Sequence, residues 1–260
     1  AMDAHTSGDK NTAVGYNALS TNTTAENNTA VGADALLTND ASNNTGIGTN
    51  ALKLNTTGDQ NTAVGHNALT SNTTAAQNVA VGQESLKACT TGAANTAVGA
   101  ESLKASTTGT QNTAVGHNAL LLTGAGTDGS YNVAVGNDAM QANTEGQANT
   151  AIGRRALYAN TTADENTAVG YSCLQANTTG AGNVAMGISA LQANTTASDN
   201  VAVGNRAMAA NTTGADNVAV GPYALDALST GDQNIAIGRH ALGATTGSDN
   251  IGIGQTALYV

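Results

Sequence analysis

The chain repeats one short pattern of apolar and polar positions along nearly its whole length. The stretch 61–69 reads Asn-Thr-Ala-Val-Gly-His-Asn-Ala-Leu, and fifteen copies of this frame occur. In each copy a short run of β-branched residues and Ala ends at Gly, and an Ala-Leu pair follows two residues later. A fixed period of this kind is the signature of a repeat architecture. The frames begin at Asn11, Asn28, Asn44, Asn61, Asn78, Asn95, Asn112, Asn132, Asn149, Asn166, Asn183, Asn200, Asn217, Asn234 and Asn250.

The apolar runs predict short β-strands, because their alternation has period two and Gly closes them too early for a helix. We expect a second short strand at the Ala-Leu segment and a turn at the Asn-Thr-Thr-Gly that usually follows. Successive frames are 17 residues apart, with two intervals of 16 and one of 20. The sequence therefore predicts an all-β parallel β-solenoid of about fifteen coils. One repeat domain is expected over 11–260, and 1–10 should be an N-terminal tail or a remnant of recombinant expression.

Stacking turns each repeat position into a column along the solenoid. The fourth position is always Val, Ile or Met and the ninth always Leu or Met, so these two columns are the predicted core. The third position holds only Ala or Gly and the eighth only Ala, Ser or Cys. Such small columns indicate close approach by another backbone, from the opposite wall or a neighbouring chain. The second position drifts from mostly Thr in early repeats to Val or Ile in late ones, so that face should become drier.

Asn at the first position and Gly at the fifth are invariant, and Asn61, Gly65 and Leu69 represent the columns to which we assign a structural role. Uniform Gly indicates a backbone with positive φ or a space without room for a Cβ atom. Stacked Asn side chains can satisfy one another in a hydrogen-bonded ladder. A ligand-binding stripe along the Asn column is the alternative.

Composition sharpens this picture, since the chain has no Phe, no Trp and 31 Gly, and its core must be narrow. The formal charge of -10 and the lack of a basic stripe weigh against nucleic acid as a partner. No apolar run approaches the roughly 20 residues that span a bilayer. Cys89 and Cys173 lie five repeats apart at different repeat positions, which excludes an intrachain disulfide in a solenoid.

Three stretches, 78–82, 149–153 and 234–238, resemble the head repeat of YadA-type trimeric autotransporter adhesins, and similar repeats occur in phage tail fibres. The resemblance covers essentially Asn11 to Leu258. It implies a left-handed β-roll, three chains side by side about a threefold axis, and attachment to a surface receptor, matrix protein or glycan. The implied location is extracellular, on a bacterial cell, with a role in virulence, or on a virion. The Asn-Thr-Thr-Gly corner makes this repeat longer than the family's, so a wider coil is expected.

A burial argument independently predicts association of chains. One coil contains mainly Ala and Val with a single Leu, and this buries little apolar area. Ordering each residue costs about 1 to 2 kcal/mol of backbone entropy. We therefore expect lateral association, and the resemblance sets the number of chains at three.

The best candidates for recognition are the positions that vary while the rest of the repeat stays uniform. The sixth and seventh positions vary most, so they should be exposed corners that form a recognition edge. The repeat of 20 residues carries an insertion within 121–131, which should be extruded as a loop. Unselected surface and a tolerated insertion are the alternatives. The candidate recognition residues are Leu121, Leu122, Thr127, Asp128, Tyr131, Arg154, Arg155, Tyr171, Tyr223, Arg239 and His240.

The sequence offers no catalytic constellation, and we predict no enzyme, no cofactor and no metal site. His66 and His117 share the sixth position but lie three repeats apart, too far to share an ion within one chain. Three copies of one His around a threefold axis are the alternative. An ice-binding solenoid is the alternative function because the chain is rich in Thr and poor in charge, although adjacent Thr56 and Thr57 point to opposite faces of an extended chain. A carbohydrate-active enzyme would lack an aromatic platform and a paired carboxylate.

Overall fold

The computed structural model describes the chain except for residues 5, 122–128 and 260. The protein is an all-β parallel β-solenoid of about 14 coils of about 17 residues, and the described part contains no helix. It divides into two compact units, an N-terminal unit Ala1–Tyr131 and a C-terminal unit Asn132–Val260. One continuous domain over 11–260 stays a prediction.

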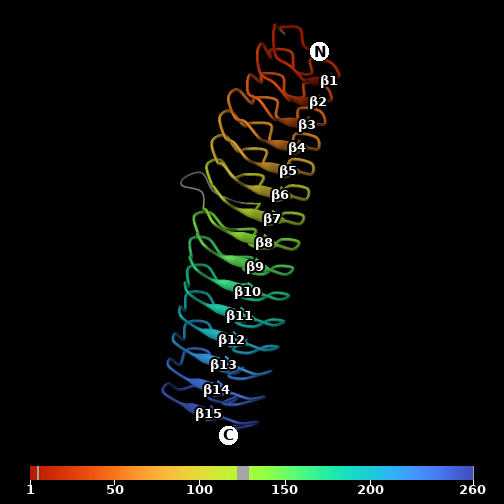
Figure 1. Ribbon diagram of the computed structural model, residues 1–260. Coiled ribbons are helices and arrows are strands. Elements are labelled where there is room, and N and C mark those ends of the chain that lie inside the picture. Colours follow the sequence, from red (N-terminus) through yellow and green to blue (C-terminus); the bar gives the residue numbers. More distant parts are fainter. Residues whose placement is uncertain (5, 122–128, 260) are drawn as a thin grey trace. The chain divides into compact units, whose positions relative to one another are not determined.

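Each coil contributes one strand, which occupies the second to fourth repeat positions (Figure 1). Neighbouring strands within a unit pair in parallel between equivalent positions, as Ala168 does with Ala185. The N-terminal unit contains β1 (Thr12–Val14), β2 (Thr29–Val31), β3 (Thr45–Ile47), β4 (Thr62–Val64), β5 (Val79–Val81), β6 (Thr96–Val98) and β7 (Thr113–Val115). The C-terminal unit contains β8 (Val133–Val135), β9 (Thr150–Ile152), β10 (Thr167–Val169), β11 (Val184–Met186), β12 (Val201–Val203), β13 (Val218–Val220), β14 (Ile235–Ile237) and β15 (Ile251–Ile253).

The Ala-Leu segment forms a turn in the described coils, so the expectation of a second strand was wrong. Both the seventh and the ninth positions have left-handed backbone, with φ of 56° at Asn67 and 50° at Leu69. A residue in this region cannot continue an extended strand. The segment still bonds to the next coil, since the backbone N of Leu69 donates to the carbonyl of Ser85 at 2.9 Å. The apolar Leu is therefore a sign of a buried position and not of an extended strand.

The core is thin and is filled by small residues and one Leu or Met from each coil. Ala63, Ala68 and Leu69, at the third, eighth and ninth positions, are fully buried. At the third position of β3, a Cβ on Gly46 would lie 3.2 Å from the carbonyl oxygen of Ala51. The small columns are therefore explained by the opposite wall of the same chain. They are interior and cannot be the contact surface between chains that the sequence left open.

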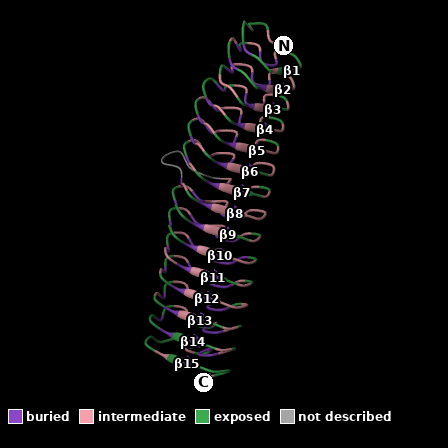
Figure 2. Cartoon of the chain, viewed as in Figure 1, coloured by how far each residue is buried: buried purple, intermediate pink, exposed green. Residues whose placement is uncertain are grey.

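The fourth column faces outward, which corrects its prediction as core while the ninth column is confirmed. Side chains alternate along a strand, so an inward Ala at the third position sends the second and fourth outward. The exposed fraction is 40% at Ile152, 44% at Met186 and 68% at Ile253. Figure 2 shows the last strands, β14 and β15, in the colour of exposed residues. The drift from Thr to Val therefore changes the outer surface and not the interior.

The Gly column meets both conditions that the sequence suggested. Gly65 has φ of 139°, and a Cβ atom there would lie 2.5 Å from the carbonyl oxygen of Gly82 in the next coil. Coils can stack at this spacing only where neither coil carries a side chain.

Two buried columns of Asn connect successive coils, and the ladder expected for the first position is confirmed. The side-chain nitrogen of Asn61 donates to the carbonyl of Ala75 at 2.8 Å, and its Oδ1 accepts from the backbone N of Asn78 at 3.0 Å. At the twelfth position, Nδ2 of Asn55 donates to Oδ1 of Asn39 at 2.6 Å. These side chains are fully buried, so a ligand-binding stripe along them is inaccessible.

The described residues of the segment 1–10 bond to the first repeat coil, whereas we expected a loose tail. The backbone N atoms of Met2 and Ala4 donate to the carbonyls of Ala18 and Ser20 at 3.0 and 2.9 Å. Thr6 Oγ1 donates to the carbonyl of Thr23 at 2.8 Å. This segment fills the later positions of a coil that precedes Asn11.

Candidate interaction surfaces

The outward face of the strands is the first candidate surface, and it differs between the two units. In the N-terminal unit the second position is Thr in every strand except β5, so a Thr column runs beside a Val or Ile column. In the C-terminal unit the second position is Val or Ile in every strand except β9 and β10. The exposed fraction reaches 37% at Ile235 and 64% at Ile251. The C-terminal unit therefore presents two adjacent aliphatic columns to its surroundings.

The corner after each strand is the second candidate surface, and in the N-terminal unit it carries ion pairs. Lys104 lies 2.7 Å from one carboxylate oxygen of Glu84, and Lys87 lies 2.9 Å from the other. Lys104 also lies 3.2 Å from Glu101. Hydrogen bonds from Lys104 and then Lys87 lower the pKa of Glu84 to about 2. The bond to Glu84 in turn raises the pKa of Lys104.

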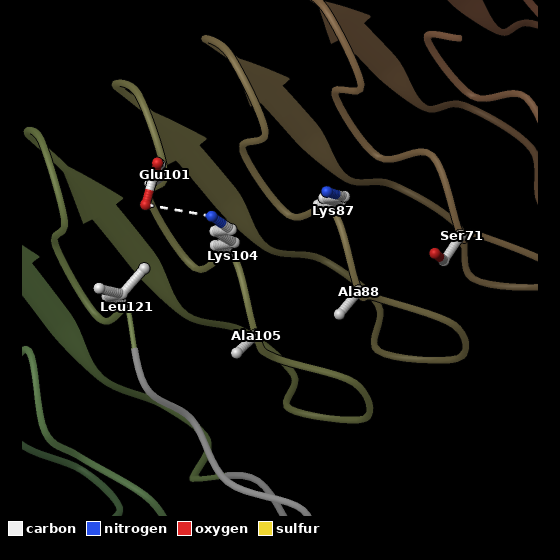
Figure 3. A pocket seen from close by; sticks show the side chains of 7 residues that line it. All are labelled: Ser71, Lys87, Ala88, Glu101, Lys104, Ala105 and Leu121. Carbon is white, nitrogen blue, oxygen red and sulfur yellow. Dashed lines mark ion pairs between the residues drawn. The ribbon is translucent and has the colours of Figure 1, made fainter.

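These lysines line an open hollow of about 450 Å³ in the N-terminal unit (Figure 3). Its lining residues are Ser71, Lys87, Ala88, Glu101, Lys104, Ala105 and Leu121. Among the sequence candidates, Leu121 reaches this hollow, whereas Leu122, Thr127 and Asp128 lie outside the described residues. Both ammonium groups already contact carboxylates, so the hollow has no excess charge with which to select a ligand.

In the C-terminal unit the same corner carries arginines that lie on tyrosine rings. The guanidinium of Arg154 lies 5.8 Å from the ring centroid of Tyr171, and that of Arg155 lies 4.6 Å from the ring of Tyr158. Contacts of this kind are attractive because the face of an aromatic ring is negative. The structure thus brings together two of the corner pairs that the sequence singled out.

A second cluster in this corner spans four later coils. Arg206 lies 5.8 Å from the ring centroid of Tyr223, which stacks on His240 at 4.9 Å. His240 meets the edge of Tyr259 at 5.7 Å. The sequence reasoning singled out Tyr223 and His240. It placed Arg206 at the variable corner without naming it as a candidate residue, and it missed Tyr158 and Tyr259. The two tyrosines could have been found from their repeat position. Both stand at the tenth position, three residues after the corner, and a left-handed turn brings this position back beside the seventh.

The remaining sequence candidates are exposed but stand apart from these clusters. Arg239 is exposed in the corner beside His240. Tyr131 is 57% exposed in the N-terminal unit, where its backbone N donates to the carbonyl of Thr110 at 3.1 Å. His66 and His117 are exposed, and the described residues hold no group of three or more His, Cys, Asp or Glu that fits a metal ion. In the described part of the chain, no helix is long and apolar enough to cross a membrane.

Neither Cys89 nor Cys173 forms a disulfide among the described residues, and both are buried in columns of the coil stack. Cys89 stands in the twelfth column, where its Sγ lies 3.2 Å from the carbonyl of Gly92 and takes the place of an Asn amide. Cys173 stands in the eighth column, and burial raises the pKa of its thiol to about 11. Thiolate chemistry is therefore suppressed at Cys173.

Fold and surfaces together define the chain as a β-solenoid repeat protein. The sequence matches no model of a known protein family, and comparison with curated proteins finds no significant match either.

Proposed function

We propose that the chain is a non-catalytic structural and adhesive fibre segment that associates side by side with its own copies and attaches to a host or cell surface. The observation that carries the proposal is the outward aliphatic face of the C-terminal unit. Val203, Val220 and Ile237 belong to this face, and the last two are 38% and 41% exposed. Contiguous apolar surface of this kind marks a site of protein association.

Each coil repeats the same exposed pair of side chains, so association covers them all at once. Burial of apolar area is worth about 25 cal/mol per Å². The thin Ala-rich interior supplies little such burial within one chain, which makes lateral contact the natural supplement. The similarity of the Asn-x-Ala-x-Gly repeats to the heads of YadA-type adhesins and to phage fibres supports three chains and an extracellular, adhesive role.

Sedimentation equilibrium of the chain tests the assembly. We expect three times the monomer mass of 25.5 kDa. Replacing Val203 and Val220 together by Glu should give folded monomers, because these side chains point outward and their charge would have to be buried on association. The matched control is Thr213→Glu, at an exposed turn position where the C-terminal unit already has Glu145. A folded wild-type chain that stays monomeric at all concentrations would sink the proposal.

The adhesive part is tested by retention of the assembled protein on immobilised matrix proteins and glycans. We expect retention on at least one surface, with no turnover of the polysaccharides offered. A general failure to bind would leave a fibre segment without an adhesive role, and turnover would contradict the non-catalytic assignment.

One observation favours ice binding as a second candidate. In the N-terminal unit, outward Thr residues at β1 to β4, β6 and β7 form a regular column beside a Val or Ile column. The sequence argument against ice binding considered only the adjacent Thr56 and Thr57, which lie outside this column. Thermal hysteresis in the presence of the protein, lost on Thr62→Lys, is the expected sign of this function. Its absence would remove the candidate.

A further inference from the structure

The sheet face of the C-terminal unit lies between two corners of opposite charge. The sixth and seventh positions follow each strand, and the sixteenth and seventeenth precede the Asn that opens the next one, so the two corners flank the face on opposite sides. The basic corner holds all four arginines of the unit, which are Arg154, Arg155, Arg206 and Arg239. The acidic corner holds six of its nine carboxylates, which are Asp164, Glu165, Asp199, Asp216, Asp232 and Asp249.

The charges on the two corners match coil by coil. The coil that starts at Asn149 carries two arginines on one corner and two carboxylates on the other. The coil from Asn200 carries Arg206 and Asp216, and the coil from Asn234 carries Arg239 and Asp249. Every coil with a basic corner therefore also has an acidic one.

Both corners are available for contact with another molecule. All six carboxylate residues are exposed, and the four arginines are exposed or half-buried. Among the described residues, no carboxylate forms an ion pair with any of these arginines. Three of the guanidinium groups, those of Arg154, Arg155 and Arg206, lie on tyrosine rings instead. On the acidic side, the backbone N of Gln147 donates to Asp164 at 2.7 Å and holds that carboxylate in place.

Symmetry decides which corners meet when the apolar faces associate. Rotation about an axis parallel to the stack keeps equivalent coils at the same height and places the basic corner of one copy beside the acidic corner of the next. An antiparallel copy would instead place the basic corners together and the acidic corners together. Like charges that meet in an interface are unfavourable, so the pattern selects the parallel arrangement.

We infer that the basic corner of the C-terminal unit recognises the acidic corner of a second copy, so that arginine–carboxylate pairs fix the direction and register of assembly. The inference rests on the proposed side-by-side association. The recognition edge predicted from the sequence would then bind a second copy of this chain. An anionic glycan is the competing occupant, and the matched carboxylates in the same coils favour the second copy.

Charge reversal in one coil tests the inference. Arg206→Glu places Glu where the N-terminal unit has Glu84, and Asp216→Lys places Lys where it has Lys10, all with φ between 54° and 59°. The backbone therefore tolerates both residues. Each single variant should raise the dissociation constant of the wild-type assembly about tenfold or more, and the double variant should restore it, because every copy again offers opposite charges. The midpoint of thermal unfolding at low concentration verifies the fold of each variant.

A covalent test does not depend on affinity. Ile188→Cys and Asp199→Cys place exposed thiols on the two corners of one coil, and the native cysteines are buried. Roughly five extended residues separate the corners, about 16 Å, so a disulfide within one chain is excluded. Mild oxidation should link copies into covalent oligomers, and neither single-cysteine variant should go beyond a dimer.

The outcomes separate the two proposals. A wild-type chain that is monomeric throughout contradicts the proposed function and this inference with it. An assembly that survives single reversal unchanged and gives no covalent oligomers overturns the inference alone. If Arg206→Glu abolishes retention on immobilised heparin but leaves assembly intact, the corner binds an anionic glycan and the inference is wrong.

Discussion

The two units are built from the same coil but present different surfaces. Inside, both stack Ala, Leu or Met, Gly and Asn in the same columns. Outside, the N-terminal unit has a Thr column on its sheet face and contains Lys but no Arg, whereas the C-terminal unit has an aliphatic face and contains Arg but no Lys. Lys53, Lys87 and Lys104 pair with carboxylates of their own chain. Arg154, Arg155 and Arg206 lie on tyrosine rings.

This difference separates the requirements of folding from those of interaction. Columns that face inward are constrained by the distance between coils and walls, so they stay nearly uniform in both units. Side chains at the corners and on the outer face meet solvent or a partner. The N-terminal unit pairs lysines with the carboxylates of this corner within the chain. In the described part of the C-terminal unit, the arginines of this corner form no ion pair.

The shared interior should fail equally in both units when the Gly column is changed. Gly65→Val and Gly170→Val each place a Cβ 2.5 Å from the carbonyl oxygen of the next coil, at a φ near 139°. We expect a loss of several kcal/mol in the free energy of unfolding from either change. Chemical denaturation followed by far-UV circular dichroism measures it.

The control is Ile188→Val at an exposed corner, which should stay within about 0.5 kcal/mol of the wild type. Ser172, a corner residue that varies in sequence, is a poor control because it is buried and has φ of 54°. Equal tolerance at Gly170 and Ile188 would show that the column has no backbone role.

The hydrogen-bonded Asn ladder at the twelfth position should distinguish the two units through smaller changes in the free energy of unfolding. Asn177→Ala in the C-terminal unit removes the donor to Asn160 and to the carbonyl of Gly180, at 3.1 and 2.9 Å. The loss should be about 1–3 kcal/mol, because buried acceptors are left unsatisfied. In the N-terminal unit, Oδ1 of Asn72 lacks a partner where Cys89 interrupts the column. Cys89→Asn should therefore stabilise the chain by about 1 kcal/mol.

Denaturation at neutral pH measures both changes, and Thr179→Ala at an exposed position of the same turn is the control. No gain from Cys89→Asn, with a normal loss from Asn177→Ala, would mean that the N-terminal interruption is compensated by neighbouring groups.

The smallest expected effect is a pH dependence confined to the ion pairs of the N-terminal unit. The folded pKa of Glu84 is about 2, below the ordinary value of 4.5. Its stabilisation is therefore fully present above about pH 4.5 and is lost as the pH falls through about 2. We expect about 0.5–1 kcal/mol, the range of a partly exposed ion pair. Denaturation curves between these pH values should show a smaller slope for Glu84→Gln.

Glu165→Gln in the acidic corner of the C-terminal unit is the matched control, measured on dissociated chains. If it lowers the pH dependence as much as Glu84→Gln does, the contrast between internally paired and unpaired charges is wrong.

Much of the fold follows from the sequence because periodicity reports stacking directly. The 17-residue frame gives the parallel solenoid, the invariant Gly gives the positive φ at Gly65, and the invariant Asn gives the ladder through Asn61. The corner residues could also be identified, since they vary where the interior does not. Their grouping into Arg–Tyr contacts could not, because it depends on how far the left-handed turn brings the tenth position back towards the seventh.

The sequence by itself determined the repeat, the parallel stacking and the columns that must stay small or polar. Tertiary structure decided which of two apolar columns is inside. Val or Ile at the fourth position and Leu at the ninth are equally apolar, but only the strand's alternation relative to Ala63 sends Val64 outward while a left-handed backbone turns Leu69 inward. Hydrophobicity shows that a side chain avoids water. The backbone geometry around the side chain determines whether it points into the core of its own chain.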